Sequence, residues 1–286
     1  MKILVTGEKG QLGSELKKNS HTNNNFEWVF TDRQSFNISD RDNIDVYLDM
    51  CKPNIIINCA AYTAVDNAEV DFENANTINH KAVELIAKWS NNNNCKLIHI
   101  STDYVYNGNS KTPYIEEDQT DPLNNYGKTK LLGDIACQKN NPSSIIIRTA
   151  WLYSSFGYNF VTKMLNLMKS KSQLNVINDQ VGSPTYAADL AEVILRIINI
   201  KTWKPGIYNY TNLGKVSWFD FANDIKSIFG FDVTIVSVST SEYFQQAKRP
   251  KYSTLDNSKI KNTFDINQMN YLDSLNKCIK ILQNES

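Results

Sequence analysis

A tyrosine and a lysine four residues apart are the pair of side chains best suited to proton transfer. Tyr126 and Lys130 stand in the run Tyr-Gly-Lys-Thr-Lys, in a segment with helical spacing, where residues four apart share a face. An ammonium beside a phenol stabilises the tyrosinate, so we expect Lys130 to lower the pKa of Tyr126 from about 10. Tyr126 would then donate a proton to a developing alkoxide. Chance produces about one such pair in a chain of this composition, so its position must support it.

Hydroxyl side chains follow the strand expected just before that helix. Ser101 ends the expected strand Lys96–Ser101, and Thr102 and Asp103 follow it. The carboxyl end of a parallel strand faces the crevice where α/β sheets bind ligands. Thr102 would therefore hydrogen-bond a substrate carbonyl and help to stabilise its oxyanion. The alternative is that both hydroxyls only cap the strand.

Three glycines, Gly7, Gly10 and Gly13, form the pattern GxxGxxG between an expected strand and an expected helix. Such glycines allow a tight turn, close approach to a pyrophosphate and packing of helix on strand. The helix N-terminus then offers N–H groups to the phosphates. The pattern predicts a dinucleotide site, and the alternative is a glycine-rich turn without a ligand.

An acidic residue is expected at the end of the second strand, where it would hold the adenosine ribose. Asp32 stands there, and its carboxylate would accept both ribose hydroxyls of NAD. Arg33, beside it, would instead pair with the 2′-phosphate of NADP, or it is a solvated surface charge. The sequence leaves NADH and NADPH open.

Short apolar strands alternate with helical segments through the first half of the chain. Continuous runs such as Ile55–Ile57 and Ile145–Ile147 suit strands buried on both faces. We expect an α/β fold, a Rossmann-type doubly wound parallel sheet over residues 1–150, with later segments packing back onto it. Ser39 would cap the helix after the second strand. Strands are expected at Lys2–Thr6, Trp28–Thr31, Asn54–Asn58, Lys96–Ser101 and Ser144–Arg148.

The pattern becomes less regular after Trp151, where we expect a smaller α+β substrate-binding lobe over residues 151–286. Its helices are expected at Asn159–Lys169, Ala187–Ile198, Ser217–Phe229 and Tyr271–Leu282, and its strands at Gln173–Ile177, Gly206–Tyr210 and Val233–Val238.

Composition narrows the class of partner. Lys+Arg and Asp+Glu both number 30, so the formal net charge of +0 argues against nucleic acid or an anionic membrane as partner. No stretch reaches the ~18 apolar residues of a membrane helix. The 5 cysteines form no CxxC pair and the 3 histidines lie far apart, so we expect reduced thiols, no metal site and a cytoplasmic protein.

Several motifs together resemble the extended short-chain dehydrogenase/reductases, and within them the branch that reduces nucleotide-linked 4-keto sugars. The resemblance covers nearly the whole chain. Its matching stretches are Gly7–Gly13, Asn58–Asp66 (NCAAYTAVD), Ser101–Tyr106 (STDYVY), Pro122–Lys130 (PLNNYGKTK), Arg148–Tyr153 (RTAWLY), Val176–Thr185 (VINDQVGSPT) and Arg249-Pro250.

The resemblance implies Tyr126 as proton donor, assisted by Lys130 and Thr102. Thr102, Asp103 and Trp151 match positions that touch the sugar nucleotide, although Trp151 would serve equally as a core residue. Arg249 matches an arginine near the nucleotide diphosphate. The implied cofactor contacts, with those argued above, are Gly7, Gly10, Gln11, Leu12, Gly13, Asp32, Arg33, Asn37, Ile38, Ala60, Ala61, Thr63, Tyr126 and Lys130.

Three positions qualify the resemblance. Asn37 stands where the family usually has an aspartate beside the adenine, and Asn67 replaces a lysine of the family's run. Glu15 matches a magnesium-linked dimer contact found in part of the family, but a glutamate in a first helical turn more often complements the helix dipole. Mg²⁺ therefore has no support from the sequence itself.

The implied activity is NAD(P)H-dependent reduction of the C4 ketone of dTDP-4-dehydro-6-deoxy-L-mannose to dTDP-L-rhamnose, the last step of dTDP-rhamnose synthesis for polysaccharides. The alternatives are a reductase of another ketosugar, such as a UDP-linked one, a dehydratase or epimerase, or a non-catalytic NAD(P)-binding regulatory subunit. Tyr104, after Thr102-Asp103, stands where sugar dehydratases carry a second acid. We expect a nucleotide sugar as the ligand and a monomer or homodimer.

Overall fold

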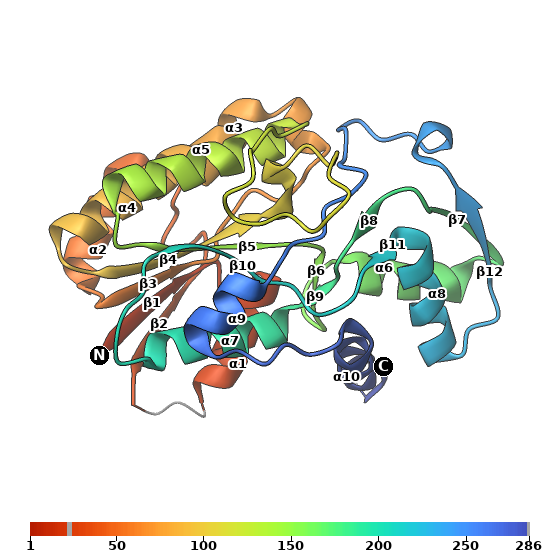
Figure 1. Ribbon diagram of the computed structural model, residues 1–286. Helices are drawn as coiled ribbons and strands as arrows, with labels where there is room; N and C mark the ends of the chain where they lie inside the picture. The colour runs from red at the N-terminus through yellow and green to blue at the C-terminus, as the bar shows by residue number, and fades with distance from the viewer. Residues whose placement is uncertain (22–24, 285–286) are drawn as a thin grey trace.

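The centre of the protein is a six-stranded sheet in which every neighbouring pair of strands is parallel (Figure 1). The computed structural model describes residues 1–21 and 25–284. The strand order is β10-β5-β4-β3-β1-β2, so the order reverses between β1 and β3, where doubly wound sheets open a crevice. The strands are β1 (Lys2–Thr6), β2 (Glu27–Thr31), β3 (Ile55–Asn58), β4 (Lys96–Thr102), β5 (Ile145–Thr149) and β10 (Gly206–Asn209).

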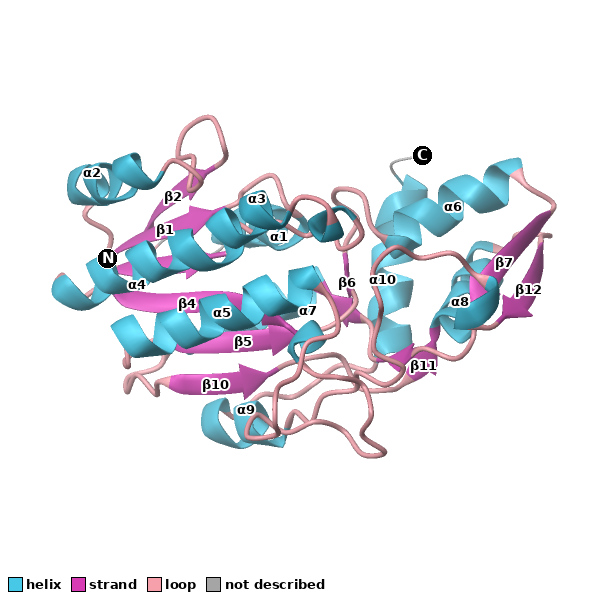
Figure 2. Ribbon diagram, turned by 90° about the horizontal axis from the view of Figure 1, so that it is seen from above, coloured by secondary structure: helices cyan, strands magenta, loops and turns pink. Residues whose placement is uncertain are grey.

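Helices cover both faces of this sheet, which confirms the predicted doubly wound α/β fold. The isoleucine runs of β3 and β5 are fully buried, with alternate residues packing into the two helical layers. Figure 2, seen from above, shows α4 and α5 lying along the strands that they cover. One layer holds α2 (Arg41–Cys51), α3 (Phe72–Asn76), α4 (Ala82–Asn92) and α5 (Asn125–Asn140), and the other holds α1 (Gln11–Ser20), α7 (Ala187–Asn199) and α9 (Ser258–Phe264).

The second half of the chain contributes to both parts of the molecule. Strand β10 pairs with β5, α7 packs against α1, and α9 packs beside β10, so three segments beyond residue 150 complete the sheet and one helical layer. The chain therefore alternates between the two parts: it builds part of the smaller lobe after β5, returns to the sheet for α7 and β10, leaves again, and returns for α9.

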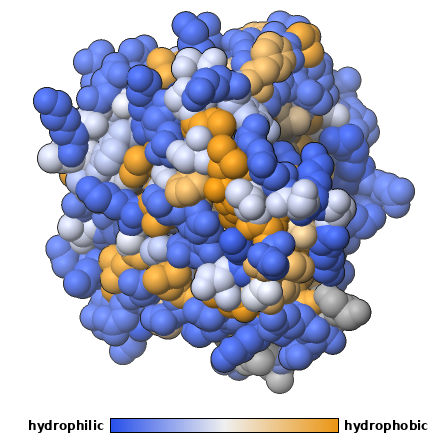
Figure 3. Space-filling view, turned by 90° about the vertical axis from the view of Figure 1, so that its right-hand side faces the viewer, coloured by the Kyte–Doolittle hydropathy of each residue, from blue (hydrophilic) through white to orange (hydrophobic). Residues whose placement is uncertain are grey.

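The smaller lobe has its own apolar core, which includes Tyr153, Phe221 and Leu275. Short strand pairs stand beside three helices there, and Figure 3 looks onto this end, where apolar residues are broken up by hydrophilic ones. The lobe contains β6 (Leu152–Tyr153), α6 (Phe160–Ser170), β7 (Gln173–Ile177), β8 (Val181–Gly182), β9 (Thr185–Tyr186), β11 (Val216–Ser217), α8 (Trp218–Phe229), β12 (Thr234–Val238) and α10 (Tyr271–Asn284).

Most expected elements lie within a residue or two of their predicted bounds, but the N-cap of α2 is one residue later than predicted. Asp40 holds that position, while the Ser39 hydroxyl donates to Asn37 Oδ1 at 2.8 Å. Because its hydroxyl is bound to Asn37, Ser39 does not cap the helix. Over residues 1–21 and 25–284, no helix has the length and apolarity needed to cross a membrane.

Candidate active site

A cavity of about 800 Å³ opens where the carboxyl ends of the sheet strands face the smaller lobe. Loops after β1, β2, β3, β4 and β5 form its floor, and residues of the smaller lobe form the opposite wall. Every site residue named from the sequence lines this cavity: Gly7, Gly10, Gln11, Leu12, Gly13, Asp32, Arg33, Asn37, Ile38, Ala60, Ala61, Thr63, Thr102, Asp103, Tyr126, Lys130, Trp151 and Arg249.

The glycine loop is packed too closely for side chains. Gly7 has φ +73°, and a Cβ there would lie 2.9 Å from Ala60 Cα, while a Cβ on Gly13 would lie 2.2 Å from the Gly7 carbonyl oxygen. Helix α1 starts at Gln11 with no side chain capping its first N–H groups. The buried Gln11 Oε1 also has no hydrogen-bond partner in the described structure. This loop of Gly7, Gly10 and Gly13, the glycine cradle, fits a dinucleotide pyrophosphate, because backbone N–H groups and a helix dipole face the cavity.

The loop after β3 is held by a buried asparagine that the sequence analysis did not single out. The side chain of Asn79 accepts from Tyr62 N at 2.8 Å and donates to Tyr62 O at 3.0 Å and to Thr129 Oγ1 at 3.1 Å. It lies in a π-helical turn, Thr77–Lys81, between α3 and α4. Asn79 therefore ties the loop of Ala60 and Ala61 to helix α5. Its only sequence signal is a polar residue within an apolar helical run.

Helix α5 places Tyr126 beside the end of β4. Asn124 caps the helix by accepting from Gly127 N at 2.8 Å. A Cβ on Gly127 would lie 2.2 Å from Tyr104 O, so the helix approaches the strand end closely. A hydrogen bond with Thr102 lowers the pKa of the Tyr126 phenol, but burial is the larger effect and raises it to about 12.

The expectation that Lys130 lowers the pKa of Tyr126 is therefore wrong for this structure. The Lys130 ammonium donates to Ile100 O at 2.6 Å, and burial lowers its own pKa to about 8. Burial, which disfavours the charged form of each group, is the largest effect on both pKa values. The phenol keeps its proton at neutral pH, so it remains a proton donor.

The buried Lys130 makes stability depend on pH. The folded protein releases this proton near pH 8, whereas the unfolded chain holds it to about pH 10.4. Between those values the unfolded chain binds more protons, so the free energy of unfolding attributable to Lys130 rises with pH, by up to about 3 kcal/mol. We expect urea denaturation between pH 8 and 10 to show this rise in the wild type and its loss in Lys130→Met. Equal slopes in the two proteins would contradict it.

Two side chains at the end of the cavity nearest the smaller lobe have unusual features. Trp151 has φ +48° and stacks on Trp218, with ring centroids 3.4 Å apart and planes 5° apart. Trp218 also lines the cavity, and no sequence pattern indicated this, because it stands at the start of an ordinary amphipathic helix. Asp103 is buried at the end of β4, and burial raises its pKa to about 7.

The Arg249 guanidinium forms an ion pair with the carboxylate of Asp66. Its two terminal nitrogens donate to Asp66 Oδ1 at 3.0 Å and Oδ2 at 2.6 Å. This bidentate pair lowers the pKa of Asp66 and joins the loop after β3 to the loop after β12 across the cavity. The guanidinium lines the cavity, where it also donates to Ala247 O at 3.1 Å and hydrogen-bonds the Tyr104 side chain.

Glu15 does not lie at a surface where it could reach a metal shared with a second subunit. Its side chain is buried, and it accepts from Ser154 Oγ at 2.6 Å, which links α1 to the smaller lobe. Burial raises its pKa. In the part of the chain that the structure describes, no group of His, Cys, Asp and Glu side chains is arranged so that it could hold a metal ion.

Comparison with known proteins adds to this geometry. The family model described as the RmlD substrate binding domain matches residues 1–284. Spore coat polysaccharide biosynthesis protein SpsK of Bacillus subtilis is 39% identical, over 91% of this chain and 90% of its own. The dTDP-4-dehydrorhamnose reductase of Aggregatibacter actinomycetemcomitans is 38% identical, over 93% and 94%. The crystal structure of dTDP-4-dehydrorhamnose reductase from Bacillus anthracis in complex with NADP superposes with TM-score 0.94 and 34% identity, over 98% and 99%.

Proposed function

The chain belongs to the RmlD substrate binding domain family, and from this membership and the site geometry we propose that it is an NAD(P)H-dependent reductase of a nucleotide-linked 4-keto sugar. The substrate is dTDP-4-dehydro-6-deoxy-L-mannose, and the product is dTDP-L-rhamnose, the last intermediate before transfer of the sugar into polysaccharides. The observation that carries the proposal is the meeting of Tyr126, Thr102 and Lys130 at a cavity that also holds the glycine cradle.

The residues present fit a nicotinamide dinucleotide. The cradle of Gly7, Gly10 and Gly13 takes the pyrophosphate, and the small side chains of Ala60 and Ala61 leave room for a flat ring system. At the other end, the buried Phe36 and Ile38 side chains line the cavity where an adenine would lie, with Asn37 between them. When bound, the nicotinamide would supply the hydride that the ketone carbon receives.

The proton that accompanies reduction comes from Tyr126. Its phenol is protonated at neutral pH, because burial raises the pKa to about 12. Thr102 lies beside it at the end of β4, and its hydroxyl donates to Asp103 Oδ1 at 3.0 Å. Turned to the ketone oxygen of a bound substrate, this hydroxyl would stabilise the charge that develops there. Lys130 donates to Ile100 O at 2.6 Å and would hold the nicotinamide ribose through its remaining N–H groups.

Plain reduction is favoured over dehydration by the residue after Thr102 and Asp103. Elimination of water needs both an acid and a base at the sugar, but Tyr104 offers only a buried phenol whose pKa is raised far above neutrality. The site therefore lacks, after Thr102 and Asp103, the second carboxylic acid that sugar dehydratases carry there.

The smaller lobe would hold the sugar nucleotide within residues 151–286, against a sheet domain built mainly from residues 1–150. Trp151 and Trp218 would offer an aromatic wall to the deoxysugar, and Arg249 would place its positive charge near the diphosphate. We expect the enzyme to work in the cytoplasm as a monomer or homodimer.

The decisive experiment is an assay of NADPH and NADH oxidation with enzymatically made dTDP-4-dehydrorhamnose. We expect turnover with the dTDP sugar and at least tenfold less with a UDP-linked ketosugar. Turnover only with a UDP-linked ketosugar would mean that the protein is a reductase of a different nucleotide-linked ketosugar. Binding of the cofactor without any turnover would instead favour a regulatory subunit.

A further inference from the structure

We propose that Trp218 and Gly182 are positioning residues for substrate binding, because together they hold the indole of Trp151 in one orientation and make it a rigid wall for the sugar ring. This inference rests on the proposed function, in which the deoxysugar of a dTDP-linked substrate lies against Trp151.

Trp151 has a backbone conformation that a bulky residue avoids. Its φ is +48°, in the left-handed region, where the Cβ crowds the following carbonyl oxygen. A residue keeps such a conformation only where its surroundings fix it, and residues of this kind gather at ligand sites. The carbonyl oxygen of Trp151 accepts from Thr185 N at 3.2 Å, and the next two residues pair with β9. The backbone is therefore fixed, and the orientation of the indole depends on its side-chain contacts.

Trp218 makes the first of these contacts. Its ring stacks on that of Trp151, with centroids 3.4 Å apart and planes 5° apart. Trp218 is the first residue of α8, directly after the N-cap Ser217, which accepts from Asp220 N at 3.1 Å. Its ring also packs on Phe160, with centroids 4.5 Å apart, in the core of the smaller lobe. The smaller lobe therefore presents a fixed flat surface to the indole of Trp151.

Gly182 makes the second contact. A Cβ on this residue would lie 2.5 Å from Cε2, 2.7 Å from Nε1 and 2.8 Å from Cζ2 of Trp151. The φ of Gly182 is outside the left-handed region, so its backbone alone does not require glycine. The ring of Trp151 requires it, because any side chain at position 182 would displace the indole. Gly182 does not line the cavity, so it acts on a ligand only through Trp151.

Backbone pairing fixes the two contacts relative to each other. Gly182 in β8 lies opposite Val216 in β11, and Trp218 follows β11 directly. The hydroxyl of Ser183 donates to Gly214 O at 2.7 Å, which joins the same two segments again. The residues that touch the indole thus belong to one unit, and the space between them is set by hydrogen bonds.

The stack also connects two apolar clusters that lie on different sides of the cavity. Trp151 packs against a small cluster that includes Tyr106 and Leu255, whereas Trp218 packs in the core of the smaller lobe. An indole held from both sides loses little conformational entropy when a ligand binds, which favours affinity. The flat ring complements the C–H groups on the apolar face of a deoxysugar.

Calorimetric titration of the full chain with dTDP-L-rhamnose and with dTDP tests the proposal, because these ligands differ only in the sugar. Gly182→Ala and Trp218→Ala should each weaken dTDP-L-rhamnose by about tenfold, the upper range for one stacked aromatic contact, and dTDP by less than threefold. Trp218→Phe keeps a flat ring and should lose less than threefold. NADPH affinity, measured by fluorescence, should stay within twofold in all three variants.

A double-mutant cycle separates positioning from direct contact. Trp151→Ala should itself weaken dTDP-L-rhamnose by at least tenfold. Adding Gly182→Ala or Trp218→Ala to Trp151→Ala should then change the affinity by less than twofold, because both residues act through the ring that is already absent. Additive losses would mean that Trp218 contacts the sugar itself or that Gly182 acts elsewhere, and either result would overturn the inference.

Phe219→Ala is the matched control. Phe219 is the neighbour of Trp218 in α8 and packs in the same core, but it does not line the cavity. This variant should bind both ligands like the wild type, and thermal unfolding should show that every variant folds. An equal loss in Phe219→Ala, or unchanged binding of dTDP-L-rhamnose in Gly182→Ala and Trp218→Ala, would overturn the inference alone. A wild type that does not bind dTDP-L-rhamnose would instead contradict the proposed function, and this inference with it.

Discussion

Replacement of Tyr126 by phenylalanine should lower turnover by about 10²- to 10⁴-fold while NADPH affinity stays within twofold of the wild type. The range is that of a single positioned proton donor. The ring of Tyr126 and its packing survive in phenylalanine, so only the hydroxyl beside Thr102 is lost. Steady-state oxidation of NADPH with the 4-keto sugar, together with fluorescence titration of NADPH, measures the two quantities separately.

Tyr104 provides the matched control for this variant. Its ring lies 5.8 Å from that of Tyr126 and its phenol is equally buried, but the proposed chemistry gives it no proton to transfer. Tyr104→Phe should therefore lose less than tenfold in turnover. Near-normal turnover in Tyr126→Phe would remove this phenol from the reaction.

The second large effect should be one of stability, at Asp134. This carboxylate and Arg148 form a buried ion pair, with Nε donating to Oδ2 at 3.1 Å and side-chain exposures of 1% and 4%. Asp134→Asn leaves the guanidinium buried without a counter-charge, which typically costs about 3–5 kcal/mol. Urea denaturation at pH 7 should show this loss as a lower midpoint with an unchanged slope.

An exposed ion pair supplies the comparison. Arg196 and Asp265 are 2.7 Å apart, with side chains 50% and 95% exposed. Asp265→Asn should change the free energy of unfolding by less than about 1 kcal/mol, because solvent screens both charges. If Asp134→Asn were no more destabilising than Asp265→Asn, Arg148 would not depend on that carboxylate.

The fold was predictable because its signals are local and agree with one another. Isoleucine runs mark strands buried on both faces, and glycines at fixed spacing mark the first strand–helix turn. Since parallel strands end at one edge, residues such as Asp32, Ala60 and Thr102 were expected to converge, and they do line one cavity. The sequence could not order the strands, so the place of β10 beside β5 emerged only in the structure.

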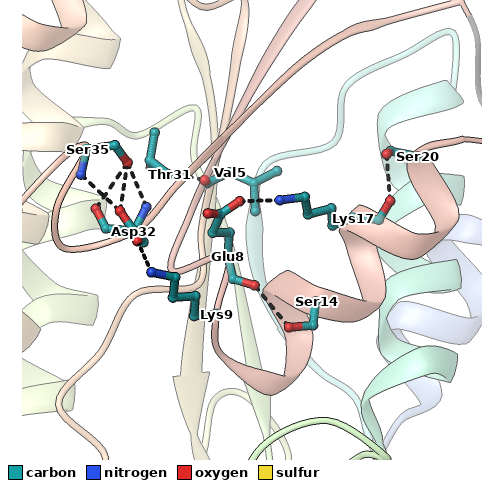
Figure 4. Close-up of polar contacts among 9 residues, drawn as sticks. All are labelled: Val5, Glu8, Lys9, Ser14, Lys17, Ser20, Thr31, Asp32 and Ser35. Carbon is teal, nitrogen blue, oxygen red and sulfur yellow. Dashed lines mark hydrogen bonds and ion pairs between the residues drawn. The ribbon is translucent and has the colours of Figure 1, made fainter.

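Details that depend on side-chain packing could not be predicted. Helical spacing brings Lys130 to the face of Tyr126, but it does not reveal that burial raises the pKa of Tyr126 or that the ammonium donates to Ile100 O. Spacing also does not identify Lys9 as the ion-pair partner of Asp32 (Figure 4), or Asn79 as the anchor of the loop after β3. The roles assigned to the cavity residues stay predictions until variants are measured.

The return of the chain to form β10 has a consequence for synthesis on the ribosome. Until residues 206–209 emerge, β5 is an unpaired edge whose residues are all buried in the finished protein. Such an edge templates association with other chains. A fragment that ends near residue 150 should therefore precipitate when it is expressed alone. A fragment in which a short linker joins residue 151 to residue 187, so that α7 and β10 are retained, should remain in the supernatant.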